Sequence, residues 1–504
     1  MWRVLLFIGL LLGIWLRWRY KNRRILKMTK KIPGPPTIPL FGNALTFMCQ
    51  PEEFIKIIKD LMIEYGGVFK LWIGPDLNIV VSNPDDIKLL LTNNKTSIKG
   101  PQYKYMADVL GGGILSGSGI HWRKHRKIAT PNYGKRAIVS YTDVFNQEVD
   151  LLLNRFKSLP KGQETDIYKY IVQCTSYTVC QTLMGLSKEE TMELPHLQYL
   201  IDMSPKLYDI VFDRMTKWYL QIDPVFWLTE SYTQQKQFKE KLRELSSAII
   251  KHRLKVLSNS DDILYLLNSE EDSSKNTQLS VIDRFILSDE FNSKDLMEET
   301  FTIFTSSQEA SAKIASFFLM MMAFHPACQE KLYTEIINVT GKDDKPVTDD
   351  DLKKMPYLEM AFKEVLRLFP IGGMLQRTIN EDISISELEY CSYTLPAGSA
   401  LVIPIYHIQR DPKLWSDPES FEPERFTPKN TKGRPPYCYI PFSLGNMDCL
   451  GRYFGAKLIK TIVIRVLRKF KLNSLNNFKN LRTIIAISTT SLDGFKVVLG
   501  SREE

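Results

Sequence analysis

The sequence predicts a mainly α-helical fold with small β-sheets. Helical spacing of apolar residues dominates from about residue 84 to residue 380. The longest pattern spans 295–323, with acidic residues at its start and a His-Pro pair after its end. Strand-like segments are short: 68–73 and 78–81 bracket a Gly-Pro-Asp turn and predict a hairpin, and 401–406 has the composition of a buried strand.

The composition is that of an ordinary globular protein. The chain has 504 residues, 44% hydrophobic and 24% charged, which is ample material for a large core. Its net charge of +9 comes from the first 31 residues, which hold nine Lys or Arg and no acid. This local excess indicates a membrane-facing tail and argues against a nucleic-acid partner. The seven cysteines form no Cys-x-x-Cys pair, which favours free thiols in a reducing compartment.

The N-terminus begins with an apolar run of 13 residues, Val4–Leu16. As a helix it spans about 20 Å, short of a hydrocarbon core of about 30 Å, and Trp2 and Trp18 extend it at both interfaces. A cleaved signal peptide is the alternative, but most of the charge follows the run and no small-x-small cleavage site is present. The basic C-terminal flank therefore predicts an uncleaved anchor with the body of the protein in the cytoplasm.

We accordingly divide the chain into residues 1–31, a membrane anchor with its basic flank, and residues 32–504, the globular domain. The domain opens with a stiff proline-rich connector, 32–39, which can be neither a helix nor a central strand. The polar stretch 268–278 predicts a surface loop.

Near the C-terminus, Cys449 lies in a loop just before an amphipathic helix. The spacing Phe-x-x-Gly-x-x-x-Cys-x-Gly places Phe442 and Gly445 before the cysteine and Gly451 after it. The glycines allow tight turns and close backbone approach. A sulfur at the positive end of a helix dipole favours the thiolate, which is the form that ligates metals. The alternative, for a lone cysteine, is a small buried hydrophobic residue.

Two further pairs have helical spacing. Trp122 and Arg126 are four residues apart, so an indole N–H and a guanidinium can point at one anion; a solvated basic helix face is the alternative. Glu364 and Arg367 are three residues apart on a helix that ends at Pro370, and they can form an ion pair. On a surface such a pair contributes less than about 1 kcal/mol.

In their order along the chain, these motifs resemble those of the cytochromes P450. The resemblance runs from the proline-rich connector to the last strands near Lys496 and implies the cytochrome P450 fold. It implies haem b as cofactor, with Cys449 as the thiolate ligand of the iron in a loop that contains Phe442, Gly445 and Gly451. It also implies that Trp122, Arg126 and Arg377 bind the haem propionates.

The same resemblance gives Glu364 and Arg367 a structural role, in a triad with Arg425 that holds the cysteine loop. One departure is that Met447 stands where the family usually has an arginine that pairs with a propionate. The resemblance therefore implies weaker haem retention than is usual in the family.

A second departure lies in the long helix, which matches the helix crossing the distal face of haem. The family's glycine, acid and threonine are replaced by Thr305, Ser307 and Gln308, and Glu309 follows. Ser307, Gln308 and Glu309 are the candidate catalytic residues. Ser307 or Glu309 can deliver protons through water in place of the usual pair, although a step of about 100° turns Glu309 aside.

Details of the motifs resemble family 4, whose members hydroxylate lipophiles. This implies a cytochrome P450 monooxygenase of the endoplasmic reticulum membrane that inserts one oxygen atom from O2 into a fatty acid, hydrocarbon or xenobiotic. Electrons would come from NADPH through NADPH–cytochrome P450 reductase, with cytochrome b5 as a further candidate donor. Because Ser307 and Gln308 replace the acid and threonine, a peroxide-dependent or isomerase-like enzyme, or a lipophile binder without turnover, stays an alternative.

Overall fold

The computed structural model describes residues 2–258, 279–387 and 391–502. The stretch 268–278, predicted to be a surface loop, lies outside the described residues. The described helices are α1 (Trp2–Lys21), α2 (Arg23–Met28), α3 (Pro51–Tyr65), α4 (Pro84–Thr92), α5 (Tyr103–Leu110), α6 (Gly119–Ala129), α7 (Lys135–Ser140), α8 (Thr142–Lys157), α9 (Tyr168–Thr182), α10 (Lys188–Met192), α11 (Leu197–Thr216), α12 (Asp223–Trp227), α13 (Glu230–Leu257), α15 (Val281–Ile286), α16 (Ser293–Phe324), α17 (Pro326–Thr340), α18 (Asp349–Lys353), α19 (Pro356–Leu368), α20 (Ile405–Ile408), α21 (Pro428–Thr431) and α22 (Arg452–Lys469).

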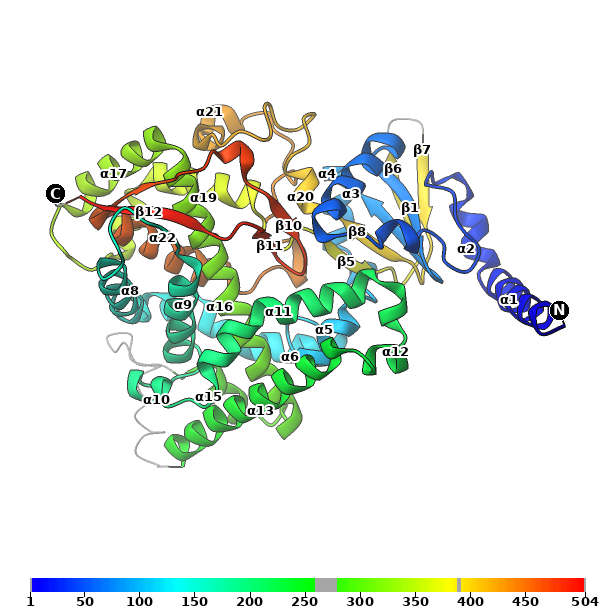
Figure 1. Ribbon diagram of the computed structural model, residues 1–504, viewed down its shortest axis with the longest axis horizontal. Helices are drawn as coiled ribbons and strands as arrows, with labels where there is room; N and C mark the ends of the chain where they lie inside the picture. The colour runs from blue at the N-terminus through cyan, green and yellow to red at the C-terminus, as the bar shows by residue number, and fades with distance from the viewer. Residues whose placement is uncertain (1, 259–278, 388–390, 503–504) are drawn as a thin grey trace.

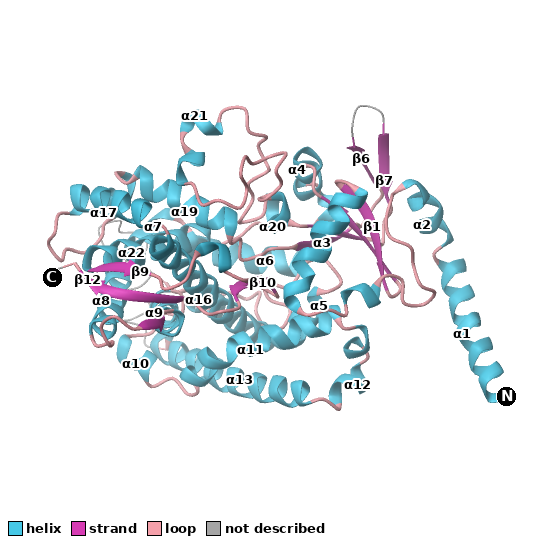
Figure 2. Cartoon of the chain, turned by 45° about the horizontal axis from the view of Figure 1, so that its top comes forward, coloured by secondary structure: helices cyan, strands magenta, loops and turns pink. Residues whose placement is uncertain are grey.

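The strands are short, as predicted, and form small sheets. They are β1 (Val68–Ile73), β2 (Asp76–Val81), β3 (Ile98–Lys99), β4 (Glu164–Asp166), β5 (Leu375–Thr378), β6 (Ile383–Glu387), β7 (Cys391–Leu395), β8 (Ala400–Ile403), β9 (Phe470–Asn473), β10 (Thr483–Ile485), β11 (Thr489–Ser491) and β12 (Lys496–Ser501). Helices cover most of the molecule in Figure 1, and Figure 2 shows the strands confined to narrow patches. The prediction of a mainly α-helical fold with small β-sheets is confirmed.

The largest sheet has the order β1-β2-β8-β5-β3. The predicted hairpin is its edge, with Val68 opposite Val81, and β2 continues into a parallel pairing with β8. The sequence prediction was wrong at the end of the helical region, because β5 is a strand within the range predicted to be helical. This matters for the site, since β5 places Arg377 opposite Lys99 of β3.

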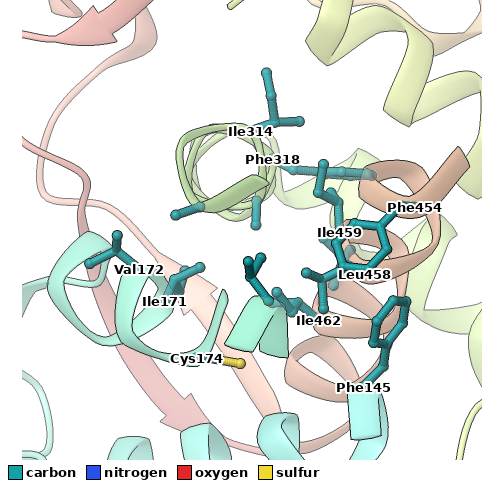
Figure 3. Packing of buried hydrophobic residues seen from close by; sticks show 14 of the residues in the cluster. Phe145, Ile171, Val172, Cys174, Ile314, Phe318, Phe454, Leu458, Ile459 and Ile462 are labelled. Carbon is teal, nitrogen blue, oxygen red and sulfur yellow. The ribbon is translucent and has the colours of Figure 1, made fainter. Parts of the chain in front are cut away.

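The long helix α16 runs through the core and packs against α9 and α22 (Figure 3). Phe318 of α16 points toward Ile459 of α22 in Figure 3, and both side chains are buried. Burying one such side chain contributes about 1.5–3 kcal/mol. Because α16 is buried on nearly every side, it holds its side chains in fixed positions.

The N-terminal helix α1 extends away from the body (Figure 2), and none of its residues is buried. Its last turns contact the large sheet, where Trp18 packs edge-on against Trp72 and its indole N–H donates to the Pro75 carbonyl at 3.3 Å. Among the described residues no single helix is both long and apolar enough to cross a membrane; α16 and α17 qualify only as a pair bent by 113°.

Candidate active site

The loop around Cys449 is held in shape by its own backbone and by a close contact with α4. The Cys449 N–H donates to the Phe442 carbonyl at 2.9 Å. Gly445 has φ of 78°, and a Cβ there would lie 2.2 Å from the Leu91 carbonyl oxygen, so only glycine fits. Gly451 differs: its φ is −84°, and an added Cβ would make an ordinary contact with Tyr133 at 3.9 Å. The protein backbone therefore requires glycine at 445 but not at 451.

Cys449 is exposed at this loop, two residues before Gly451, the N-cap of α22. Loss of solvation raises the pKa of the Cys449 thiol, whereas the Gly451 amide and the positive charges of Arg126 and Lys99 act to lower it. The thiol is thus accessible and faces groups that stabilise its anion, and a coordinated metal ion would deprotonate it outright.

Arg126 and Lys99 lie close to Cys449, and Arg377 lies opposite Lys99 on the neighbouring strand. Arg126 donates to the Asp448 carbonyl at 2.7 Å and to its carboxylate at 2.6 Å. Arg377 is only 2% exposed, and its Nη2 has no hydrogen-bond partner among the described residues. Burial, Arg377 and Arg126 together hold the pKa of Lys99 well below its usual value. Because these cations repel one another, the cluster favours an anionic ligand.

Lys99 was not among the predicted site residues. It belongs to no motif, and only the pairing of β3 with β5 brings it opposite Arg377. Lys99 ends a strand of two residues, and nothing in the sequence around it distinguishes it from a surface lysine.

Trp122 is buried on α6, but its indole N–H donates to the Ile114 carbonyl at 2.9 Å. The Arg126 guanidinium lies 5.4 Å from the Trp122 ring centroid. The two predicted residues thus lie together, yet in this arrangement only Arg126 directs hydrogen bonds toward the Cys449 loop. Glu299, fully buried on α16, accepts from the Ile114 N–H at 3.0 Å and contacts His125 Nδ1 at 2.7 Å.

The triad implied by the resemblance is present and buried. Arg367 makes paired contacts with the Glu364 carboxylate at 2.7 and 2.8 Å, and Arg425 Nε lies 3.3 Å from the same carboxylate. Arg367 also donates to the carbonyls of Gln409, Pro418 and Ser420. The pair therefore organises the chain leading to the Cys449 loop and is not a surface ion pair.

On α16, a small open face identifies which distal residues lie near the site. Between Glu299 and Ala323, a stretch described throughout, only Ser306, Ser307 and Ala310 are not buried. Their spacing places them on one side of the helix. The Ser307 side chain acts to lower the pKa of the Tyr133 hydroxyl and the charge of Cys449 acts to raise it, so Tyr133 lies between the open face and the cysteine loop.

Tyr133 is a further residue that the sequence analysis missed. It follows α6 in a short 3-10 turn and is buried. Burial is the main cause that raises its pKa, so the phenol keeps its proton at neutral pH. No sequence pattern marks it, because its role depends on the packing of α6 and α22 beside α16.

The other two predicted catalytic residues do not share the open face. The Gln308 side chain accepts from the Ser176 hydroxyl at 2.8 Å and lies 3.4 Å from Ser204, so it faces α9 and α11. Glu309 forms a buried ion pair with Lys313 at 2.5 Å and contacts Ser488 at 3.3 Å. The structure therefore separates Ser307 from Gln308 and Glu309, because successive helical residues point about 100° apart.

An apolar cavity of about 200 Å³ lies against β5, the strand that carries Arg377. Leu375 and Gln376, which precede Arg377 on β5, form part of its wall. The remaining wall is mostly aliphatic and aromatic, and includes Phe47, Phe54, Phe212, Met374 and Ile487. Such a lining favours ligands that bury hydrocarbon groups against it.

Comparison with known proteins agrees with these observations. The profile of the cytochrome P450 family matches residues 32–488. Cytochrome P450 4d1 of Drosophila melanogaster is 30% identical over 495 residues, which cover 95% of this chain and 94% of the relative. Cytochrome P450 4V2 of Homo sapiens is 29% identical over 445 residues, covering 86% and 83%. Cytochrome P450 4c3 of Drosophila melanogaster is 27% identical over 498 residues, covering 96% and 91%.

The residues present fit an iron porphyrin. An accessible thiol suits the iron, and a cluster of cations with an unpartnered buried guanidinium nitrogen suits carboxylate side chains. The match over most of the sequence, the helical fold and this donor set lead to one conclusion: the chain belongs to the cytochrome P450 family, and it is a monooxygenase that binds haem b.

Proposed function

We propose that this protein is a haem-thiolate monooxygenase that inserts one oxygen atom from O2 into a lipophilic substrate. The observation that carries the proposal is the exposed Cys449 thiol beside the cation cluster of Lys99, Arg126 and Arg377. Haem b, when bound, supplies the activation of O2. Cys449 would ligate its iron, and the three cations would hold its propionates.

The apolar cavity supports a hydrocarbon-rich substrate, such as a fatty acid, a hydrocarbon or a xenobiotic. It shares the β5 strand with Arg377, so a ligand in the cavity would lie next to the end of the porphyrin that carries the propionates. Aromatic and aliphatic walls exclude water and leave few polar groups to orient the substrate.

We further propose that Ser307 and Tyr133 hold the distal proton. The Ser307 side chain acts to lower the pKa of the Tyr133 hydroxyl, and Ser307 belongs to the open face of α16. A pair of hydroxyls can pass a proton by exchanging donor and acceptor roles, which the amide of Gln308 cannot do. Glu309 stabilises Lys313 in this arrangement and is not free to act as a base.

Electron supply and location follow the family pattern. The exposed helix α1 and its basic flank support anchoring in the endoplasmic reticulum membrane, with the body in the cytoplasm. Arg123, Lys124 and Lys127 are exposed on α6, where they can receive the acidic face of NADPH–cytochrome P450 reductase or of cytochrome b5.

Aerobic turnover with reductase tests the proposal. Purified protein with NADPH and a panel of fatty acids should yield hydroxylated products and a red-shifted Soret band in the ferrous carbonyl complex. Cys449→Ser should abolish that band and the products, whereas Cys438→Ser, which changes a buried cysteine, should keep both. Retention of the band in Cys449→Ser would refute the proposal.

A second candidate is a haem-thiolate enzyme that uses peroxide instead of O2 and NADPH. It is favoured by the engagement of Gln308 with Ser176 and of Glu309 with Lys313, which removes both from proton delivery. Turnover that is fast with added hydrogen peroxide and negligible with reductase and NADPH would select this candidate.

A further inference from the structure

Away from the Cys449 loop, three metal-binding side chains converge where α6 meets the first turn of α16. His121 and His125 are four residues apart on α6, and Asp295 lies near the start of α16. One potential ligand atom from each lies within 4.8 Å of the others. His121 Nε2 is 3.4 Å from an Asp295 oxygen, and the two imidazole centroids are 4.6 Å apart.

His125 is already oriented as a metal ligand would be. It is 3% exposed and stacks on Phe291 at 4.1 Å, so its ring has little freedom to turn. Its Nδ1 meets the buried Glu299 carboxylate at 2.7 Å, and its Nε2 has no hydrogen-bond partner among the described residues. A carboxylate on one ring nitrogen fixes the tautomer and leaves the other nitrogen as a lone-pair donor, the usual outer-shell arrangement of metal-bound histidine.

The unpartnered nitrogen needs an explanation, since a buried polar atom without a partner costs about 1–3 kcal/mol. In the neutral tautomer whose Nδ1 proton is donated to Glu299, Nε2 carries a lone pair that can accept from a donor or bind a cation. No such donor lies within hydrogen-bonding distance among the described residues.

We propose that His121, His125 and Asp295 bind a divalent cation of the zinc class. Two imidazoles and one carboxylate are a ligand set typical of Zn²⁺, and two histidines one helical turn apart share a face. Ligands of a tetrahedral ion at about 2.0–2.1 Å lie closer together than 4.8 Å, so the site must contract. The His121 side chain, 63% exposed, can make that movement.

The cation would tie α6 to α16. Two lysines adjoin these ligands in the sequence: Lys124 is paired with Glu290 at 2.5 Å, and Lys294 lies 3.7 Å from Glu298, so each has its own counter-charge. Glu299 joins the site to Ile114, whose carbonyl accepts from Trp122. Binding would therefore stiffen the helix that carries Trp122 and Arg126.

Zinc binding to the haem-loaded, full-length protein tests this inference. After treatment with EDTA, equilibrium dialysis against Zn²⁺ should load one ion per haem, measured by atomic absorption. His121→Ala and Asp295→Asn should each weaken that binding by at least about tenfold. X-ray absorption at the zinc edge should show imidazole and oxygen ligands without sulfur.

The matched control is His196→Ala, which removes another histidine paired with a carboxylate, Glu244 at 2.7 Å, and should leave zinc binding unchanged. His121 is exposed, so its variant should keep the native Soret spectrum, which also separates this test from the proposed function. Equal zinc affinity in wild type and His121→Ala, or sulfur in the zinc shell, would overturn the inference.

Discussion

At the scale of single residues, Lys99 changes how much haem affinity we expect the protein to lose by having Met447 in place of arginine. The family's arginine at 447 is missing, but Lys99 brings a cation to the same neighbourhood, as its interaction with Cys449, Arg126 and Arg377 shows. Met447 itself is buried and adds apolar contact. The weak haem retention expected from Met447 therefore depends on Lys99.

We predict that Lys99→Met accelerates haem transfer to apomyoglobin. Loss of a charge-assisted hydrogen bond costs about 1.5–3 kcal/mol, or about 10- to 100-fold in affinity. The control Lys95→Met removes an exposed lysine paired with Glu381 at 3.4 Å and should leave the rate unchanged. Met447→Arg should slow haem loss more in the Lys99→Met background than in wild type; equal effects would show that the two positions are independent.

The hydroxyl pair gives a second residue-scale prediction. Ser307→Ala should lower the product formed per NADPH by about tenfold or more, because a positioned proton donor contributes at least that factor. Hydrogen peroxide should make up the difference, measured with a peroxidase assay. Ser306→Ala is the matched control, since its hydroxyl already donates to the Thr302 carbonyl at 2.5 Å. Tight coupling in Ser307→Ala would exclude Ser307 from proton delivery.

At the scale of elements, the contact between α19 and the loops that follow it depends on buried charge. Glu364 on α19 is fully buried with Arg367 and Arg425, and removing one partner of such a group leaves an uncompensated charge. We predict that Glu364→Gln destabilises the protein by about 3–5 kcal/mol, measured by urea unfolding.

The control lies on the same helix: Glu359→Gln removes a carboxylate whose side chain is 41% exposed. Its loss should cost no more than about 1 kcal/mol. Similar unfolding midpoints for the two variants would contradict a buried role for Glu364.

The contact of α20 with α3 gives a pH dependence. His407 is buried, its Nε2 lies 2.9 Å from the Ile55 carbonyl, and burial lowers its pKa to about 4. Because the unfolded chain binds a proton below about pH 6.5 and the folded protein does not, stability falls as pH drops from about 6.5 to 4. This pH change lowers the free energy of unfolding by about 3 kcal/mol at most. His407→Gln should flatten this part of the urea-midpoint profile, and an unchanged slope would assign it to other groups.

Sequence patterns predicted these elements well where the signal is local. Helical periodicity located α16 within two residues at its start and one at its end, and the glycine-containing turn located β1 and β2. The strand β5 was missed because four residues between a helix and a turn carry too little periodicity. The sequence also did not predict which side of α16 faces the site. Periodicity gives the angles between side chains around the helix axis, but not which side of the helix is turned toward Cys449.

At the scale of the whole molecule, α1 stands apart from the compact body (Figure 2). Its leucine, isoleucine and phenylalanine side chains are exposed to solvent. We predict that deletion of residues 1–31 reduces flotation with phospholipid vesicles, because this exposed apolar surface is lost. Replacing Arg23 and Arg24 with Gln, which keeps the apolar run, should reduce flotation less. Undiminished flotation of the deletion variant would place membrane attachment in the body.

The contact of Gly445 with Leu91 has a consequence for Cys449. The polypeptide itself sets the shape of the Cys449 loop. Gly445 packs against a backbone carbonyl, and the buried Glu364–Arg367–Arg425 triad holds the preceding chain. A change at Gly445 would therefore reach the metal ligand through the backbone, because any side chain there would push the loop, and Cys449 with it, away from Leu91.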